Sequence, residues 1–237
     1  MRTFSQTDVG KKRDNNEDYI LINETLGLYI VADGMGGHNA GEVAAKIACE
    51  SIEVAVKAKC LEGGFKFEDE IESILAEANI AIKKIGEAQP EYSNMGTTVV
   101  IAYLDHEMLY VANVGDSRLY MVNAETLHQI TKDHSLVAEL IKIGSISESE
   151  AANHPDKNII TSALGVDEKF DFYQTKMPYF EYRYILLCTD GLTNMLSKEA
   201  LFEIIKDNEP DVIPNKLIES ANANGGLDNV TVICIEL

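Results

Sequence analysis

Residues 28–38 read Leu-Tyr-Ile-Val-Ala-Asp-Gly-Met-Gly-Gly-His, and the architecture of the chain can be worked out from this segment. Its first five residues are apolar and β-forming, which predicts a buried strand ending at Asp33, directly before Gly34. Residues 18–23 form another apolar run, and the turn at Gly27 predicts that the two strands are neighbours. A carboxylate at the end of a buried strand is held rigidly, so Asp33 is a candidate site residue.

The rest of the chain alternates between helix pairs and strands. Apolar residues recur at helical spacing over 40–58 and 68–87. Closely spaced strands follow at 97–104, 108–114 and 117–122, and we predict that they pair antiparallel because their connections are too short for a crossover. Further strands are predicted at 127–130, 170–177, 183–189 and 229–236, and further helices at 197–207 and 211–223. This order predicts an α+β fold, a four-layer αββα sandwich of two antiparallel sheets flanked by helix pairs.

Residues 135–165 interrupt this regular pattern with short helical pieces, Gly144 and Pro155. We therefore predict a single domain over 1–237 with an irregular flap at about 135–165. The apolar run Leu136 to Ile143 is expected to pack the flap onto the body of the protein. Residues 145–157 would then be free to contact a partner, since recognition tends to reside in irregular segments on a rigid scaffold.

Composition excludes several classes of function. Hydrophobic residues make up 46% of the 237 residues and the net charge is −19, so a phosphate backbone would be repelled and nucleic acid is not expected as a partner. No run approaches the roughly 20 apolar residues of a membrane span, and the N-terminus lacks the apolar stretch of a signal peptide. The cysteines form no CxxC pair, which predicts reduced thiols in the cytoplasm and argues against zinc: Cys49, Cys60, Cys188 and Cys234.

Three more aspartates resemble Asp33 in their position beside an apolar strand, namely Asp116, Asp190 and Asp228. A single aspartate of this kind is more often a turn or capping residue, but four with the same surroundings suggest a cluster. Carboxylates close together cannot all stay ionised unless cations neutralise them. Ligation by oxygen alone selects hard ions, so the cluster predicts magnesium or manganese.

A calcium loop is the alternative for the acidic residues near the N-terminus. Asp14, Asn16 and Asp18 match the first three ligand positions of an EF-hand. However, Tyr19 stands where that loop needs glycine, and Thr25 stands where it needs a bidentate glutamate. An EF-hand is therefore rejected.

Seven blocks of sequence, taken together and in order, resemble the PPM family of protein phosphatase 2C type, and the short chain resembles its compact bacterial branch. Each block alone is a weak signal, whereas the ordered set covers essentially the whole chain. The blocks are Asp8-x-Gly10-x-x-Arg13-x-x-Asn16-Glu17-Asp18, Asp33-Gly34-Met35-Gly36-Gly37-His38, Gly96-Thr97-Thr98, Gly115-Asp116-Ser117-Arg118, Ala163-Leu164-Gly165, Asp190-Gly191-Leu192 and Asp228-Asn229.

The resemblance implies a serine/threonine phosphatase that binds two to three Mn²⁺ or Mg²⁺ ions. In such an enzyme a hydroxide bridging two metals attacks the phosphate in line. Asp33 would bridge the two metals, and the carbonyl of Gly34 would complete one site. Asp190 and Asp228 would hold the other metal, and Asp116 with Asp190 would hold a weaker third.

The resemblance also implies roles for residues around the metals. Arg13 would bind the substrate phosphate, for which its planar guanidinium is well suited. Asp18 would orient metal-bound waters, and Glu17 is a further contributor to the metal site. Met35 stands where many eukaryotic members have a proposed acid histidine, so the general acid stays open between His38 and a metal-bound water.

The implied partners are phosphorylated proteins, including serine/threonine kinases and their substrates, and the chain is expected to act as a monomer without nucleic acid or membrane insertion. Phosphatases that act on anti-sigma-factor antagonists generally lack the arginine motif, so Arg13 argues against that subclass. A pseudophosphatase typically loses metal aspartates, whereas Asp33, Asp190 and Asp228 are all present. The sequence leaves open the physiological substrates and the choice between manganese and magnesium.

Overall fold

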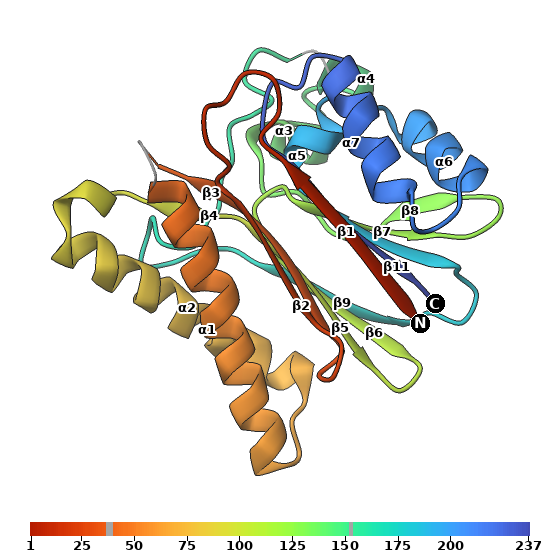
Figure 1. Ribbon diagram of the computed structural model, residues 1–237. Coiled ribbons are helices and arrows are strands. Elements are labelled where there is room, and N and C mark those ends of the chain that lie inside the picture. The colour runs from red at the N-terminus through yellow and green to blue at the C-terminus, as the bar shows by residue number, and fades with distance from the viewer. Residues whose placement is uncertain (37–39, 152–153) are drawn as a thin grey trace.

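The computed structural model describes residues 1–36, 40–151 and 154–237. Two antiparallel sheets pack face to face, and a pair of helices covers the outer face of each (Figure 1). The predicted αββα sandwich is therefore confirmed. None of the helices in these described ranges is long and apolar enough to span a lipid bilayer.

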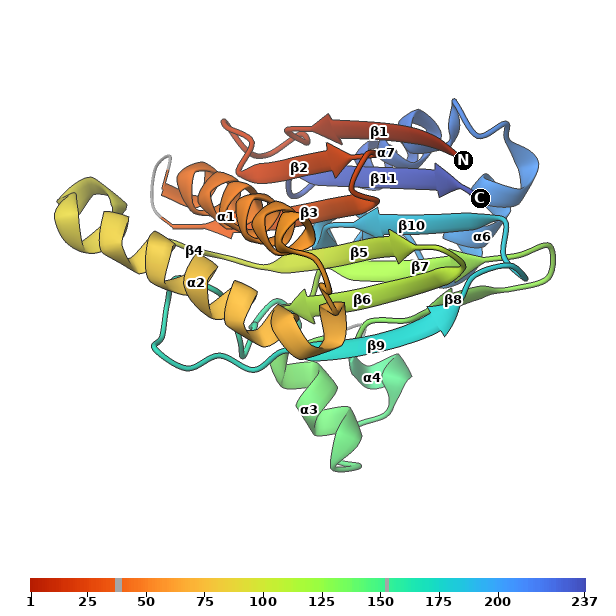
Figure 2. The same ribbon diagram turned by 90° about the horizontal axis from the view of Figure 1, so that it is seen from below.

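The first sheet has the strand order β2-β3-β5-β6-β9 and lies under α1 and α2 (Figure 2). A short strand, β4, pairs with the end of β3. The elements of this half are β2 (Asp18–Asn23), β3 (Leu28–Met35), α1 (Ala40–Glu62), α2 (Phe67–Ala88), the 3-10 turn η1 (Pro90–Tyr92), β4 (Gly96–Thr97), β5 (Val99–Asp105), β6 (Met108–Val114) and β9 (Tyr173–Pro178).

The second sheet has the order β1-β11-β10-β7-β8 and is covered by α6 and α7. Its strand β11 pairs antiparallel with both β1 and β10. The elements of this half are β1 (Arg2–Asp8), β7 (Arg118–Val122), β8 (Leu127–Gln129), β10 (Tyr184–Cys188), α5 (Asp190–Thr193), α6 (Lys198–Asp207), α7 (Ile213–Ala223) and β11 (Val230–Glu236).

Three apolar layers hold the sandwich together, because burial of apolar surface drives the packing. One lies between α1, α2 and the first sheet, and a second lies between α6, α7 and the second sheet. The third fills the space between the sheets and includes Val31, Val100, Leu119, Leu187 and Ile233. On α2 the predicted apolar stripe is buried, as expected of an amphipathic helix.

The pairing of two predicted strands was wrong. Residues 108–114 and 117–122 were expected to pair directly, but β6 pairs with β5 and β9, whereas β7 pairs with β10 and β8. The chain crosses from one sheet to the other at Gly115, which has a φ of +92°. Both strands then contribute to the layer between the sheets, because Val111 and Leu119 belong to the same apolar cluster.

Strand β1 was not predicted, since its sequence Arg-Thr-Phe-Ser-Gln-Thr-Asp is largely polar. It is an edge strand with no fully buried residue, and it takes its place in the sheet from seven register positions shared with β11. Polar side chains suit an edge, where they discourage pairing with another molecule.

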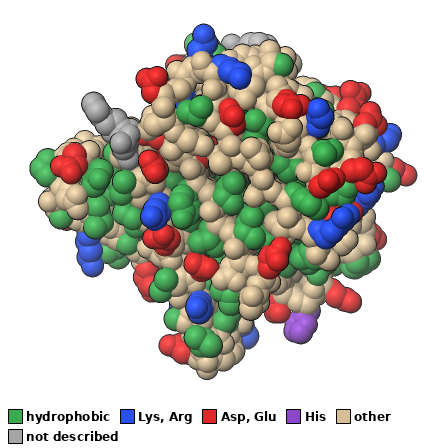
Figure 3. Space-filling model, viewed as in Figure 1, with side chains coloured by type: hydrophobic (Ala, Val, Ile, Leu, Met, Phe, Trp, Pro, Cys, Tyr) green, Lys and Arg blue, Asp and Glu red, His purple; other side chains and the backbone are tan. Residues whose placement is uncertain are grey.

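The flap contains two short helices, α3 (Leu136–Lys142) and α4 (Glu148–Ala151), which project beyond β9 (Figure 2). No residue of α3 is fully buried, and Ile143 is 72% exposed. The expectation that Leu136 to Ile143 packs the flap onto the body was therefore wrong for Ile143. Figure 3 shows acidic side chains spread over one face with lysine and arginine among them, so the net charge is not gathered into one patch there.

Candidate active site

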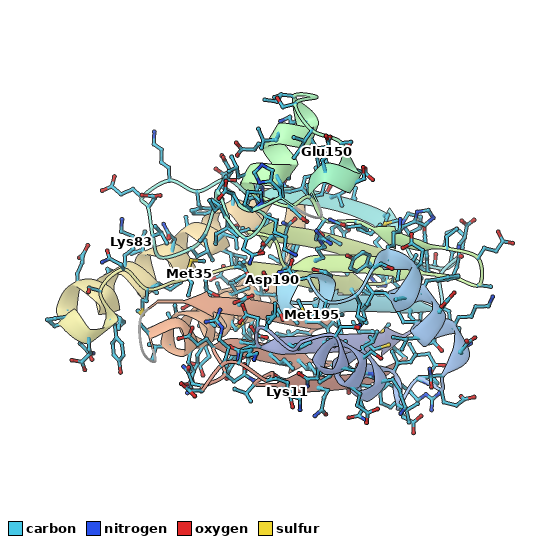
Figure 4. All side chains as sticks on the ribbon, turned by 90° about the horizontal axis from the view of Figure 1, so that it is seen from above. Lys11, Met35, Lys83, Glu150, Asp190 and Met195 are labelled. Atoms are coloured by element: carbon cyan, nitrogen blue, oxygen red, sulfur yellow. The ribbon has the colours of Figure 1, made fainter. Side chains whose placement is uncertain are left out.

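The predicted carboxylates gather at one end of the sandwich, between the two sheets. Asp18 and Asp33 occupy paired positions on β2 and β3. Asp190 follows β10, Asp228 precedes β11, and Asp116 lies in the crossing between β6 and β7. Figure 4 looks onto this end, with Asp190 near the centre of the view and Met35 and Met195 on either side.

Burial and mutual repulsion raise the pKa of four of these carboxyl groups. Burial, followed by the charges of Asp190 and Asp228, raises the pKa of Asp18 to about 7. Burial, followed by the charges of Asp190 and Asp133, raises the pKa of Asp116 to about 8. The pKa of Asp33 lies well above its ordinary value, first because of burial and then because of the surrounding aspartates.

The pKa of Asp190 is raised as well, by burial and then by the charge of Asp228. Neighbouring carboxylates therefore raise the pKa of all four groups, although a hydrogen bond with Asp33 lowers the pKa of Asp190 in part. Without a compensating cation, such a group of carboxylates takes up protons near neutral pH.

Two carboxylate oxygens in this cluster are buried without a hydrogen-bond donor among the described residues, Asp18 Oδ1 and Asp190 Oδ1. The second oxygen of each group does have a partner. Asp18 Oδ2 accepts from the Thr189 hydroxyl at 2.9 Å, and Asp190 Oδ2 accepts from Asn194 Nδ2 at 2.8 Å. Each carboxylate is thus anchored through one oxygen, whereas its other oxygen is buried without a donor, which is costly unless a ligand satisfies it.

The backbone of Asp33 is fixed by the two threonines that follow Gly96. Thr98 Oγ1 accepts from the Asp33 N–H at 3.1 Å, and the Asp33 carbonyl accepts from Thr97 Oγ1 and from the Thr98 N–H, both at 2.9 Å. Thr98 Oγ1 also lies 2.7 Å from Ser117 Oγ, next to Asp116. Hydrogen bonds of this kind hold a site residue within a narrow range of positions.

Arg13 lies at the open side of the cluster. Its Nη2 donates to Asp228 Oδ2 at 2.8 Å, and its side chain is 49% exposed. The other oxygen of Asp228 accepts from the Asn229 N–H at 2.8 Å. Arg13 therefore lies beside the acidic cluster with its guanidinium partly open to solvent, and its role in binding phosphate stays a prediction.

Glu17 is buried beside Gly34 and the start of α1. Its carbonyl accepts from the Gly34 N–H at 3.1 Å, and its own N–H donates to Asn229 Oδ1 at 2.8 Å. Burial raises the pKa of Glu17. A Cβ on Gly34 would lie 2.1 Å from the carbonyl oxygen of Gly41, so the glycine permits a close approach of α1 to β3.

Sequence reasoning did not assign roles to the polar residues that anchor the carboxylates. Thr189 is the polar residue between the apolar strand β10 and Asp190, and this position is the signal that could have found it. Asn229 donates to the carbonyls of Val9 and Asn15, and so holds the loop that carries Arg13. The only signal for Asn229 was its place beside Asp228 in a motif.

The donor set suits hard divalent cations, because it consists of carboxylates with two unpaired oxygens. The side chains are not gathered for coordination as they stand: across residues 1–36, 40–151 and 154–237, no three carboxylate, imidazole or thiol groups are grouped so that they could hold a metal ion.

The proposed acid His38 lies outside the described residues. Met35 ends β3 and is half-buried at this end of the molecule. A thioether cannot donate a proton, so the structure adds no candidate for the general acid at position 35.

Comparisons with known proteins agree with the seven sequence blocks. A family model described as protein phosphatase 2C matches residues 9–210. The chain is 39% identical to the serine/threonine phosphatase stp of Listeria monocytogenes over 241 residues, which cover 100% of this chain and 96% of that protein. It is 38% identical to the protein phosphatase PhpP of Streptococcus pneumoniae over 238 residues, covering 98% and 95% of the two chains.

A solved structure of the serine/threonine phosphatase Stp1 from Staphylococcus aureus superposes with a TM-score of 0.92. That match has 34% sequence identity and covers 99% of this chain and 94% of the other. The fold, the order of the sequence blocks and the position of the carboxylate cluster therefore all agree with these comparisons.

Proposed function

Because the chain belongs to the protein phosphatase 2C family, we propose that its carboxylate cluster binds two Mn²⁺ or Mg²⁺ ions and hydrolyses phosphoserine and phosphothreonine in proteins. The chain is a metal-dependent serine/threonine phosphatase. The observation that carries the proposed metal site is the pair of buried unpaired oxygens on Asp18 and Asp190 within a group of mutually repelling carboxyls.

In the proposed site Asp33, the Gly34 carbonyl, Asp190 and Asp228 would hold the two main ions, with Asp33 serving both. Asp116, together with Asp190, would hold a weaker third ion. When bound, the cations supply a water of lowered pKa as the nucleophile and neutralise charge on the phosphoryl group.

The side chains of the protein hold the substrate and the surrounding groups in place. Arg13 leaves Asp228 and binds two oxygens of the phosphate, so that the phosphorus faces the cluster in one orientation. Asp18, anchored by Thr189, would orient the waters that the cations bring into the site. Glu17 supports this arrangement from the backbone of Gly34.

We propose a cytoplasmic monomer that acts on products of serine/threonine kinases. The four cysteines are free thiols, and unpaired cysteines are typical of reducing compartments. The flap at about 135–165 would select among protein substrates within a single catalytic domain.

The test is hydrolysis of p-nitrophenyl phosphate and of a phosphothreonine peptide with Mn²⁺, with and without chelator. We expect turnover only with the metal, and recovery when the metal is restored. A matched control is Asp105→Asn, which neutralises an exposed carboxylate at the opposite end of β5 and should change nothing. Turnover that persists in chelator would contradict the proposal.

A further inference from the structure

The turn that carries Asp116 is fixed through both peptide groups of Gly115. The Gly115 carbonyl accepts from the His134 N–H at 3.0 Å and from Asn113 Nδ2 at 3.2 Å. The Gly115 N–H donates to the ring nitrogen His134 Nδ1 at 3.1 Å. A Cβ on Gly115 would lie 2.5 Å from Thr98 Cγ2, so the turn is also confined by packing.

His134 is at the same time the residue at which the flap leaves the body of the protein. Its carbonyl accepts from the Thr161 N–H at 2.9 Å, on the returning strand of the flap. The next residue, Ser135, forms an isolated bridge with Ile160. One residue therefore connects both sides of the flap stem to the turn before Asp116.

The imidazole of His134 is suited to accept a hydrogen bond. The side chain is partly buried, and burial lowers its pKa, so the ring is neutral at neutral pH. With the proton on Nε2, the lone pair of Nδ1 faces the Gly115 N–H. The adjacent Arg118 does not compete for this nitrogen, because its guanidinium is paired with Asp133.

The side chain of His134 has a distinct task from its backbone. The Gly115 carbonyl has two donors, so the loss of one would leave the other in place. For the Gly115 N–H the acceptor is the imidazole, and its removal would leave a buried donor without a partner. An unpaired buried N–H is costly, and the turn would shift until water or another acceptor reached it.

We propose that His134 is a positioning residue: its Nδ1 holds the Gly115 N–H and thereby fixes Asp116 relative to the flap stem. This inference rests on the proposed function, because Asp116 matters only if the cluster is the catalytic site. It predicts that catalysis depends on a hydrogen-bond acceptor at the position of Nδ1 and not on an imidazole as such.

Three substitutions separate these requirements. His134→Asn places its Oδ1 near the position of Nδ1, His134→Gln carries its acceptor one bond further out, and His134→Leu has none. The control is His128→Leu, which removes an exposed histidine on β8. For each variant the measurements are kcat and KM with p-nitrophenyl phosphate at saturating Mn²⁺, the melting temperature, and hydrogen exchange of the Gly115 amide.

We expect His134→Leu and His134→Gln to lose about tenfold or more in kcat with little change in KM, the factor that one hydrogen bond is worth. The Gly115 amide should exchange faster in both. His134→Asn should keep kcat within about threefold and retain amide protection, and His128→Leu should match the parent.

Equal kcat and equal Gly115 protection in His134→Asn and His134→Gln would overturn the proposal, and this comparison stands even if His134→Leu fails to fold. Protection lost in all variants alike, with no rescue by asparagine, would also overturn it. A parent protein without Mn²⁺-dependent hydrolysis would instead refute the proposed function, and the amide-exchange comparison would still decide whether His134 holds the turn.

Discussion

The aspartate cluster and the flap are joined at His134 but are built in opposite ways. The cluster is made of carboxylates beside strand ends and in the crossing between β6 and β7, where burial raises their pKa values. The flap has short helices, and α3 has no fully buried residue. Mutually repelling carboxyl groups are thus buried beside strands of the two sheets, whereas the acidic side chains of α3 and α4 are exposed to solvent. We therefore expect chemistry to depend on the cluster for every substrate, and substrate choice to depend on the flap.

The sharpest way to break this comparison is Asp33→Asn. Because Asp33 is the proposed bridge between two cations, we expect kcat to fall by roughly a thousandfold or more at saturating Mn²⁺ for every substrate. The variant should stay folded and melt at a higher temperature than the parent in chelator, since one of the repelling carboxyls is gone.

Kinetics and thermal melting measure both effects of Asp33→Asn. Near-normal kcat would show that Asp33 does not bridge the ions. A melting temperature of Asp33→Asn below that of the parent in chelator would show that repulsion between the buried carboxyl groups does not destabilise the folded protein.

Asp116→Ala should have the next largest effect. Asp116 lies in the crossing between the sheets, apart from the strand ends that carry Asp33, Asp190 and Asp228. We expect turnover to fall by about a hundredfold while two ions still bind tightly. Calorimetric titration with Mn²⁺ checks this, and the loss of a tight site would make Asp116 one of the main ligands.

Arg13→Ala tests the open side of the cluster. Phosphate binding is partly shared by ground and transition states, so we expect KM for a phosphopeptide to rise about tenfold with a smaller fall in kcat. Lys12→Ala is the matched control, because it removes a neighbouring exposed cation. An unchanged KM in Arg13→Ala would make Arg13 an ordinary surface residue.

The raised pKa values predict how stability depends on pH in chelator. Asp18 and Asp116 have pKa values of about 7 and about 8 in the folded protein, against an ordinary value of 3.8. Between these values the folded state binds more protons than the unfolded state, so stability falls as pH rises from about 4 to about 8. A loss of 1 kcal/mol in the free energy of unfolding lowers the melting temperature by about 2–4 °C at this chain length. We therefore expect the melting temperature to fall by at least about 3 °C over this pH range.

Two controls tie this trend to the cluster. Asp18→Asn should flatten the dependence on pH, whereas Asp105→Asn should leave it unchanged. A melting temperature that stays level or rises with pH in chelator would contradict the raised pKa values of Asp18 and Asp116.

The smallest effect is expected in the flap. Replacing the segment Ser147-Glu148-Ser149-Glu150 with neutral residues should change relative rates among phosphopeptides by a few-fold and leave aryl phosphate hydrolysis nearly untouched. Parallel loss of both activities would show that the flap supports the metal site, and the contrast between the two regions would fail.

Sequence reasoning predicted the layers of the fold because apolar periodicity reports directly on burial, as in the stripe along α2. The predicted pairing of β6 with β7 was wrong, because the chain crosses to the other sheet between them. The apolar pattern of a strand does not report where such a crossing occurs. Sequence reasoning singled out the aspartates because they stand beside apolar strands, directly before or after glycine or at a strand boundary. It gave no roles to Thr189, Asn229 and His134, whose importance comes from contacts between residues far apart in the chain.

The pairing of β1 with β11 has a consequence for the order in which the molecule is made. Arg2 and Glu236 share a hydrogen bond although 234 residues separate them along the chain. As the chain leaves the ribosome, every strand of the sheet β2-β3-β5-β6-β9 has emerged once residue 178 is out, whereas β1 has no neighbour until β11 follows. Long-range pairing of this kind closes late, after local contacts have formed. Because Asp228 directly precedes β11, the first sheet can form in a nascent chain before the proposed metal site is complete.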